Sequence, residues 1–210
     1  MKGSKSRRNF IASHVRDTPR SGIREFFEIV STQKDVISLG IGEPDFVTPW
    51  HIREAAIFAL DHGTTSYTAN LGTIELRRAV SDYIRNSFGV RYSPDDEVII
   101  TVGVSEAFDL AIRAFVEPGF EVMYHEPCYV SYPSVIKFAH GVPVCVETKR
   151  SNAFKLTRRM LEEKVTDRTR MLLLNFPTNP TGATISRREL RGIAEFAIKH
   201  DLIVLADDIY

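Results

Sequence analysis

The second half of the chain alternates between short apolar runs and longer stretches in which apolar residues recur every three or four positions. The short runs have the length of buried β-strands and occupy residues 97–101, 120–124, 142–146, 171–174 and 202–206. The longer stretches have helical periodicity and occupy residues 105–115, 130–139, 157–164 and 186–199. Strands separated by helices predict an α/β domain with a largely parallel sheet.

Helix boundaries are also indicated. A helical face follows Thr48-Pro49 and stops near His62-Gly63, and a second helix with apolar positions from Ile74 onward ends before Gly89. Ser186 and Glu189 have the spacing of a capping box, which predicts the start of the helix that runs to Lys199.

Charge and composition narrow the classes of function. The 27 basic residues balance the 27 acidic residues, so nothing favours nucleic acid or a membrane surface as a partner. No window approaches the roughly 18 unbroken apolar residues of a membrane span. The basic opening stretch has no apolar core behind it, so it is not expected to be a secretory signal. It is expected to be a disordered tail or an arm that reaches across a partner subunit, and a transit peptide is the alternative. Two cysteines and no metal-ligand spacing predict a cytoplasmic protein without a structural metal.

Polar and glycine-rich segments follow three of the predicted strands directly. Residues 103–105 follow one strand, residues 175–182 follow another, and residues 207–210 follow a third. In open α/β sheets, ligands bind beyond the carboxyl ends of the strands. The three segments therefore predict one ligand site.

The first of these segments, Thr101-Val-Gly-Val-Ser-Glu-Ala107, leads from a strand through a glycine into a helix. The backbone amides and dipole of such a helix start suit a phosphate group. Gly103 would let the backbone approach the ligand, and Ser105 would add a hydroxyl donor. The alternative reading makes Ser105 a plain helix N-cap.

The other segments each allow a cofactor contact and a plain structural role. Asn179 lies in a loop fixed by two prolines and a glycine, where it presents an amide to the sheet edge or closes a turn. Asp207 would keep a heteroaromatic ring nitrogen protonated, as an electron-withdrawing cofactor requires, or would mark a strand meeting water. Tyr210 would donate to a phenolic oxygen of the same ring. Tyr129 would stack on a planar cofactor or pack in a loop.

Six segments in this order resemble the class I/II aminotransferases, the fold-type I pyridoxal-phosphate enzymes. The resemblance runs from about residue 37 to residue 210, over 39–46, 67–77, 103–107, 129–133, 179–182 and 207–210. It implies a three-layer large domain with a mostly parallel sheet, incomplete at its C-terminus. Residues 1–45 would form an N-terminal arm and part of the small domain, and residues 46–210 the pyridoxal-phosphate-binding large domain.

The resemblance assigns the cofactor phosphate to residues of two subunits. Gly103, Val104 and Ser105 match the cradle that holds the phosphate through backbone and hydroxyl groups. Tyr67 is similar to the tyrosine that reaches this phosphate from the neighbouring subunit. The resemblance therefore implies a homodimer with shared active sites.

The cofactor ring is assigned in the same way. Tyr129 matches the aromatic residue that stacks on the pyridine ring, and Asp207 matches the aspartate paired with the ring nitrogen. Asn179 and Tyr210 match the pair that hydrogen-bonds the phenolic oxygen. The segment containing Ile41-Gly42 resembles the one that closes over the substrate carboxylate.

The chain departs from the family pattern by absence. The Schiff-base lysine of the family lies beyond Tyr210, and so does the arginine that holds the substrate carboxylate. Lys199 precedes the last strand and is expected to be a solvated surface lysine. The full-length protein is expected to move an amino group between an L-amino acid and a 2-oxoacid, while the 210 residues alone are expected to be inactive.

Alternatives remain in other classes. A related pyridoxal-phosphate lyase or synthase would use the same cofactor site. A truncated remnant would bind cofactor without catalysis. A non-enzymatic regulator would need a DNA-binding module in the roughly 35 residues before the first matched segment, which are too few. A dinucleotide-binding dehydrogenase would need a pattern that Gly40-Ile-Gly42-Glu-Pro-Asp fails at its last glycine.

Overall fold

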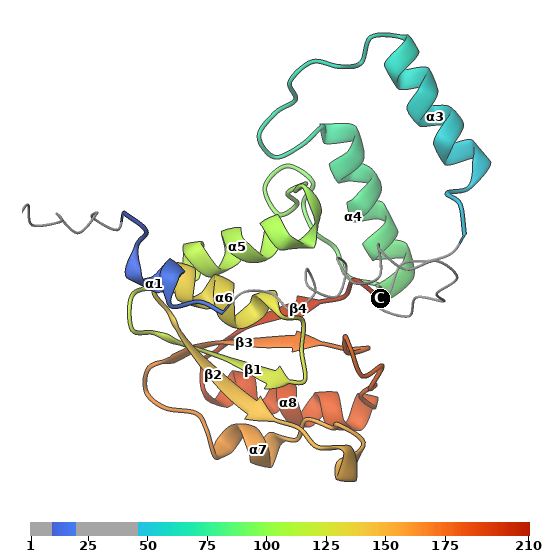
Figure 1. The fold of residues 1–210 in the computed structure, drawn as a ribbon. Coiled ribbons are helices and arrows are strands. Elements are labelled where there is room, and N and C mark those ends of the chain that lie inside the picture. The colour runs from blue at the N-terminus through green and yellow to red at the C-terminus, as the bar shows by residue number, and fades with distance from the viewer. Residues whose placement is uncertain (1–9, 20–45) are drawn as a thin grey trace, which may run out of the picture. The chain divides into compact units, whose positions relative to one another are not determined.

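The structure is a computed structural model that describes residues 10–19 and 46–210 (Figure 1). These residues belong to two compact units. One unit contains residues 10–19 and 102–210, and the other contains residues 46–101. The expected division into an N-terminal segment, 1–45, and a large domain, 46–210, stays a prediction.

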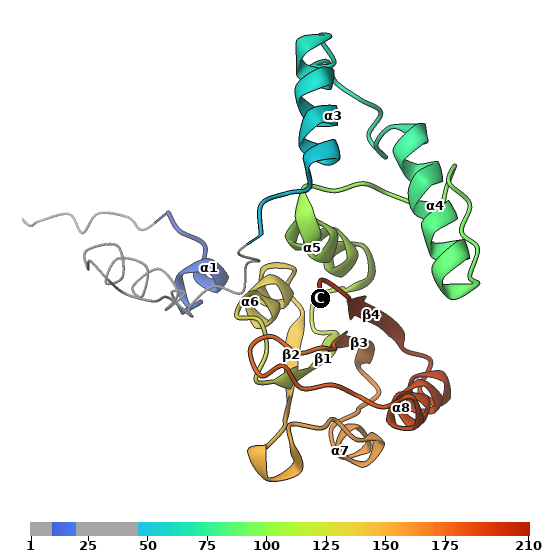
Figure 2. The same ribbon diagram turned by 90° about the vertical axis from the view of Figure 1, so that its right-hand side faces the viewer.

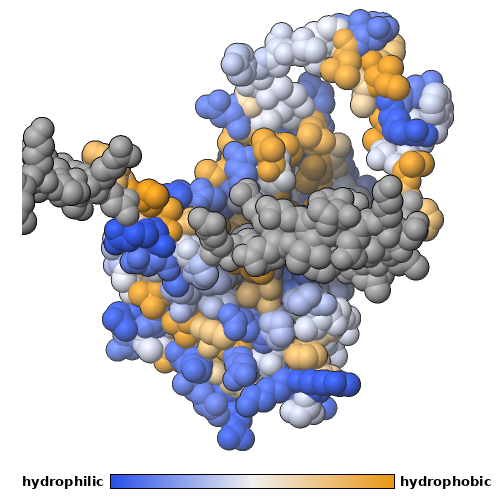
Figure 3. All heavy atoms as spheres, in the orientation of Figure 1, coloured by the Kyte–Doolittle hydropathy of each residue, from blue (hydrophilic) through white to orange (hydrophobic). Residues whose placement is uncertain are grey.

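The unit of residues 46–101 contains two helices, α3 (Trp50–Asp61) and α4 (Ile74–Phe88), where the periodicity predicts them. The side chain of Thr73 accepts a hydrogen bond from the Leu76 amide at the start of α4, and Gly89 ends the helix with φ of 73°. Within the described residues α3 buries none of its side chains, and apolar residues are exposed along it (Figure 3).

The loop before α4 is fixed by Gly72 and Arg77. Gly72 has φ of +89°, and a Cβ atom at this position would lie 2.6 Å from the side chain of Ile100, so the backbone conformation and the space both require glycine. The buried guanidinium of Arg77 donates to the carbonyl of Gly72 at 3.2 Å and to the carbonyls of Pro94 and Asp95. These contacts give a structural reason for Gly72 and Arg77, which belong to the segment 67–77 that carries part of the family resemblance.

The prediction of a strand at residues 97–101 is wrong. Residues 98–101 have no strand structure, and Ile100 donates its amide to the carbonyl of Leu71, a loop residue, at 3.0 Å. A β-strand requires a neighbouring strand for its ladder of hydrogen bonds. No strand among the described residues pairs with this run.

The other unit is built on a four-stranded parallel sheet. Its strands are β1 (Glu121–Glu126), β2 (Val142–Glu147), β3 (Thr169–Asn175) and β4 (Ile203–Asp207), in the order β2-β1-β3-β4. These are the remaining predicted strands, displaced by at most a few residues at their ends. The predicted α/β class with a parallel sheet is confirmed.

Helices cover both faces of this sheet (Figures 1 and 2). One face carries α5 (Gly103–Phe115) and α6 (Ser131–Phe138), with the short α1 (Ser13–Arg16) beside α6. The other face carries α7 (Arg158–Glu162) and α8 (Arg187–Lys199), and a 3₁₀ turn, η1, spans Arg150–Asn152. From β1 the chain moves outward to β2, and from β3 it moves outward in the opposite direction to β4. Right-handed crossovers therefore place α6 and α8 on opposite faces.

Two apolar cores follow from this layering. On β3, Met171 and Leu173 pack beneath α5 and α6, while Leu172 and Leu174 pack against α7 and α8. Because successive side chains of a strand point to opposite faces, a wholly apolar run is the pattern required of a strand covered on both sides. The capping box of Ser186 and Glu189 is present at the start of α8, as predicted.

Replacing Gly141 with alanine is expected to destabilise the protein. A Cβ atom at Gly141 would lie 2.7 Å from Val116 and 3.1 Å from the buried side chain of Ile136, so the core would have to shift. We expect a loss of about 1–3 kcal/mol in the free energy of unfolding, measured by urea denaturation of the full-length protein. Gly192→Ala in α8 is the matched control, because a Cβ atom there meets nothing within 4 Å. That variant should gain up to about 1 kcal/mol from helix propensity. Equal effects of the two variants would contradict the packing argument.

His125 on β1 is a buried histidine held in its neutral form. It is 2% exposed, stacks on Phe176 with ring centroids 4.8 Å apart, and has no hydrogen-bond partner for either ring nitrogen among the described residues. Burial lowers the pKa of His125 to about 4, and an interaction with the Asn175 backbone, outside hydrogen-bond geometry, offsets only part of this shift.

His125 should therefore make the fold sensitive to acid. The unfolded chain takes up a proton at His125 near the ordinary histidine pKa of about 6.5, whereas the folded chain does so only near 4. The protein therefore becomes less stable as the pH is lowered from about 6.5 to about 4. We expect a loss of roughly 2 kcal/mol in unfolding free energy between pH 7 and pH 5 from this group. Urea denaturation at both pH values should show a smaller loss for His125→Phe, and equal losses in the two proteins would refute the assignment.

Candidate active site at the strand ends

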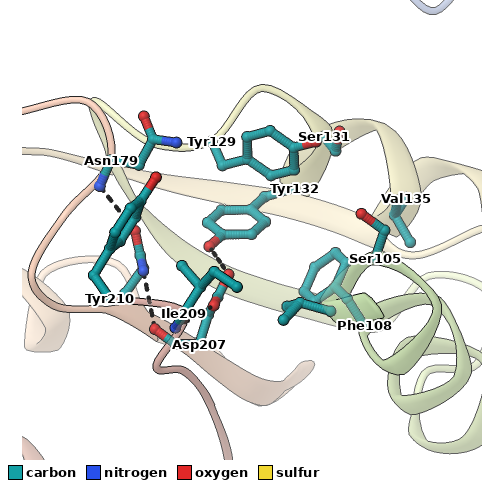
Figure 4. A pocket seen from close by; sticks show the side chains of 12 residues that line it. Ser105, Phe108, Tyr129, Ser131, Tyr132, Val135, Asn179, Asp207, Ile209 and Tyr210 are labelled. Carbon is teal, nitrogen blue, oxygen red and sulfur yellow. Dashed lines mark hydrogen bonds between the residues drawn. The ribbon is translucent and has the colours of Figure 1, made fainter. Parts of the chain in front are cut away.

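A cavity of about 320 Å³ lies beyond the carboxyl ends of the parallel strands (Figure 4). Small-molecule pockets have volumes of roughly 300–1,000 Å³, so the cavity suits a small ligand. Its lining comes from three of the four strand ends and from two helices: Val104, Ser105, Phe108, Tyr129, Ser131, Tyr132, Val135, Asn175, Asn179, Asp207, Ile209 and Tyr210.

The strand order explains why these residues meet. The chain leaves β1 toward β2 on one side and leaves β3 toward β4 on the other, so the crossovers diverge between β1 and β3. A divergence of this kind opens a crevice outside the carboxyl ends of the strands. The residues that follow β1, β3 and β4 line that crevice.

The first turn of α5 lies at one side of the pocket. Its N-cap is Val102, which has no polar side chain, and Gly103 follows with φ of +78°. Ser105 is the third residue of the helix, so the reading of Ser105 as a plain N-cap is wrong. Val104 and Ser105 line the cavity at a helix start, where amides and the helix dipole favour an anion.

The carboxylate of Asp207 is held by two donors. The hydroxyl of Tyr132 donates to Oδ2 at 2.5 Å, and the amide of Ile209 donates to Oδ1 at 3.2 Å (Figure 4). Burial, followed by the hydrogen bond to Asp207, raises the pKa of Tyr132 above its ordinary value, so this hydroxyl stays a donor. A carboxylate has about four acceptor sites, so two remain for a ligand.

Asn175 locks the loop after β3 onto the end of β4. Its Nδ2 donates to the carbonyl of Asp207 at 2.9 Å, and its Oδ1 accepts from the amide of Asn179 at 3.0 Å. The hydroxyl of Thr178 donates to the Asn175 carbonyl at 2.8 Å. Asn175 is 1% exposed and was not among the predicted site residues. Its only signal in the sequence is an amide at the end of an apolar run.

Aromatic rings form the floor of the pocket. Tyr132 packs between Phe108, with ring centroids 5.1 Å apart, and Tyr129, at 5.7 Å in an edge-to-face arrangement. Phe108 and Tyr132 are also members of the core beneath α5 and α6. Tyr129 is half-buried and presents a ring to the cavity, as a stacking residue requires.

The structure brings most of the predicted site residues together. Val104, Ser105, Tyr129, Asn179, Asp207 and Tyr210 line the same pocket, and Gly103 is the first residue of α5. Their assigned contacts with a cofactor stay predictions.

The remaining predicted residues lie elsewhere or outside the described part of the chain. Tyr67 belongs to the unit of residues 46–101, and its side chain is fully exposed. Ile41 and Gly42 lie outside the described residues. Lys199 forms an ion pair with Glu162 and has 54% of its side chain exposed, as expected of a surface lysine.

Comparison with known proteins gives this arrangement a family. The model of the family described as aminotransferase class I and II matches residues 34–210. The chain belongs to the class I and II aminotransferase family. The resemblance that the six segments indicated is therefore confirmed.

The aminotransferase family relationship extends to individual proteins. A putative aminotransferase, YugH, of Bacillus subtilis is 51% identical over 96% of this chain and 52% of its own length. An aspartate aminotransferase of Pyrococcus abyssi is 44% identical over 90% of this chain and 49% of its own length. The solved structure of an aspartate aminotransferase from Thermus thermophilus with maleate has a TM-score of 0.90 and 35% identity, covering 97% of this chain and 54% of that one. The chain spans about half the length of the curated relatives it matches.

Two kinds of feature are absent from the described residues. None of their helices has the length and apolar character needed to cross a membrane. No group of three or more histidine, cysteine, aspartate or glutamate residues within 10–19 and 46–210 is arranged to hold a metal ion.

Replacing Asn175 with alanine should loosen the site and destabilise the protein. The change leaves the Asp207 carbonyl and the Asn179 amide without their buried partner, which costs roughly 1–3 kcal/mol of unfolding free energy. Urea denaturation measures the change. Asn152→Ala is the control, because Asn152 makes comparable bonds at an exposed turn and should lose well under about 1 kcal/mol. Similar losses in both variants would contradict the role given to Asn175.

Proposed function

We propose that the full-length protein is a pyridoxal-phosphate-dependent aminotransferase that moves an amino group between an L-amino acid and a 2-oxoacid. The observation that carries the proposal is the pocket itself. Six residues assigned to the cofactor from the sequence line one cavity, at the place where an α/β sheet binds ligands. Membership of the class I and II aminotransferase family supports the same reaction.

The donor set of the pocket fits pyridoxal phosphate. The start of α5 with Ser105 offers an anion site suited to a phosphate group. Asp207 lies at the end of β4 with acceptor sites left over, as a protonated ring nitrogen requires. Tyr129 supplies an aromatic face to cover a planar ring. A phosphate, a ring and a ring nitrogen thus each have a matching group.

Six of the predicted site residues have a defined task in the proposed reaction. The cofactor, when bound, withdraws electrons from the substrate carbon that loses its proton. Asp207 would hold the proton on the ring nitrogen, and Asn179 and Tyr210 would hydrogen-bond the phenolic oxygen. Gly103, Val104 and Ser105 would bind the phosphate. A lysine outside these 210 residues would carry the proton to and from the substrate.

We further propose a cytoplasmic homodimer. Tyr67 would reach the phosphate of the partner subunit, and its full exposure leaves it available for such a contact. The exposed apolar side chains of α3 support assembly, because surfaces of this kind mark contacts with other proteins.

Ile41 and Gly42 would close over the substrate carboxylate. Both cysteines are free thiols, which suits a reducing compartment.

Replacing Asp207 with alanine in the full-length protein should remove most of the activity. The loss of a preorganised charge at the ring nitrogen should lower kcat/KM by roughly a hundred- to a thousandfold. The assay follows 2-oxoacid formation from a panel of amino acids, with ammonia release measured alongside. Asp208→Ala, which removes the neighbouring carboxylate outside the pocket lining, is the matched control and should stay near the wild-type rate.

The outcomes separate the candidate functions. Near-normal turnover in the Asp207→Ala variant would refute the assignment of Asp207 to the cofactor ring nitrogen. Ammonia release without transfer of the amino group would identify a lyase. No activity with any amino acid would favour a cofactor-binding remnant. The 210 residues expressed alone should be inactive in the same assay.

A further inference from the structure

The hydroxyl of Tyr132 is aimed at the carboxylate proposed to hold the cofactor ring. It donates to Oδ2 of Asp207 at 2.5 Å across 75 residues of sequence (Figure 4). Tyr132 is 2% exposed, and its ring is fixed between Phe108 and Tyr129. A side chain packed in this way has one available direction for its hydroxyl group.

We propose that Tyr132 is a positioning residue for the cofactor ring nitrogen, because its hydroxyl orients the carboxylate of Asp207 toward that nitrogen. A hydrogen bond to a charged carboxylate is short and directional, so it fixes where the carboxylate oxygens point. A carboxylate that faces the ring nitrogen can keep a proton on it, whereas one turned away cannot. The Ile209 amide fixes the other oxygen at 3.2 Å, so the plane of the carboxylate is set by two donors.

This proposal rests on the proposed function, since it acts through a ring nitrogen that pyridoxal phosphate would supply. It also predicts an effect on cofactor binding that a purely structural role of Tyr132 would not produce. The effect of Tyr132 should depend on the ring nitrogen and on nothing else in the cofactor. A ligand that lacks this nitrogen should therefore be insensitive to loss of the hydroxyl.

The experiment uses the full-length apoprotein, titrated with pyridoxal phosphate and with its 1-deaza analogue, in which a C–H group replaces the ring nitrogen. Tyr132→Phe should weaken binding of pyridoxal phosphate roughly tenfold, the scale of one lost hydrogen bond to a charged group. Binding of the deaza analogue should change by less than about twofold. The absorption spectrum of bound pyridoxal phosphate should also change in this variant, because the ring is protonated less fully.

Tyr124→Phe is the matched control. Tyr124 is 5% exposed, lies in the same core, and donates its hydroxyl to the carboxylate of Glu126 at 3.1 Å, outside the pocket lining. This variant should bind both ligands like the wild type. Thermal unfolding of the two apoproteins gives a readout that is independent of cofactor.

Asp207→Ala separates the two proposals. It should lose discrimination between pyridoxal phosphate and the deaza analogue. If Asp207→Ala loses discrimination and Tyr132→Phe does not, the role of Tyr132 is refuted while the proposed function stands. If Tyr132→Phe weakens both ligands equally, its role is structural and the proposal is also refuted. If the wild-type protein does not bind pyridoxal phosphate, the proposed function and this inference fail together.

Discussion

The parallel pairing of β3 with β4 sets the geometry of the whole pocket. This register places Asn175 opposite Asp207 at the last step of the ladder. The side-chain amide of Asn175 can then donate to the Asp207 carbonyl, while its oxygen accepts from Asn179. A shift of one residue would turn the side chains of the shifted strand to the opposite face of the sheet and separate Asn175 from Asp207. The apolar residues that fix the register, Met171 to Leu174 on β3, therefore also fix the site.

Most of the sheet could be predicted because its signals are local. Wholly apolar runs indicate strands covered on both faces, and the residues directly after them must lie at the carboxyl edge. The start of α8 could be predicted from Ser186 and Glu189, which are three residues apart. The prediction of a strand at 97–101 was wrong because it also rested on a local signal alone. Its side chains suit a strand, but a strand also depends on a partner, and no local pattern reports whether the partner is present.

The contacts missed at the site are long-range. Asn175 and the Asp207 carbonyl are 32 residues apart, and Tyr132 and the Asp207 carboxylate are 75 residues apart. An asparagine at a strand end and a tyrosine in a helix have many structural roles, and only the fold shows what each one faces. Sequence patterns could therefore indicate which residues line the pocket, but not which of them hold the others in place.

The floor of the pocket is also the core of the domain. Phe108 and Tyr132 pack with Val122 and Leu173 beneath α5 and α6, and the same two side chains line the cavity. Protein cores are close-packed, so a floor of this kind cannot shift without disturbing its neighbours. The hydroxyl of Tyr132, which belongs to this core, therefore lies at a fixed distance from the Asp207 carboxylate. A carboxylate that is aligned in advance needs little reorganisation when charge develops on a ligand. The core thus serves the proposed chemistry through rigidity, and the same apolar packing that stabilises the sheet aligns its polar edge.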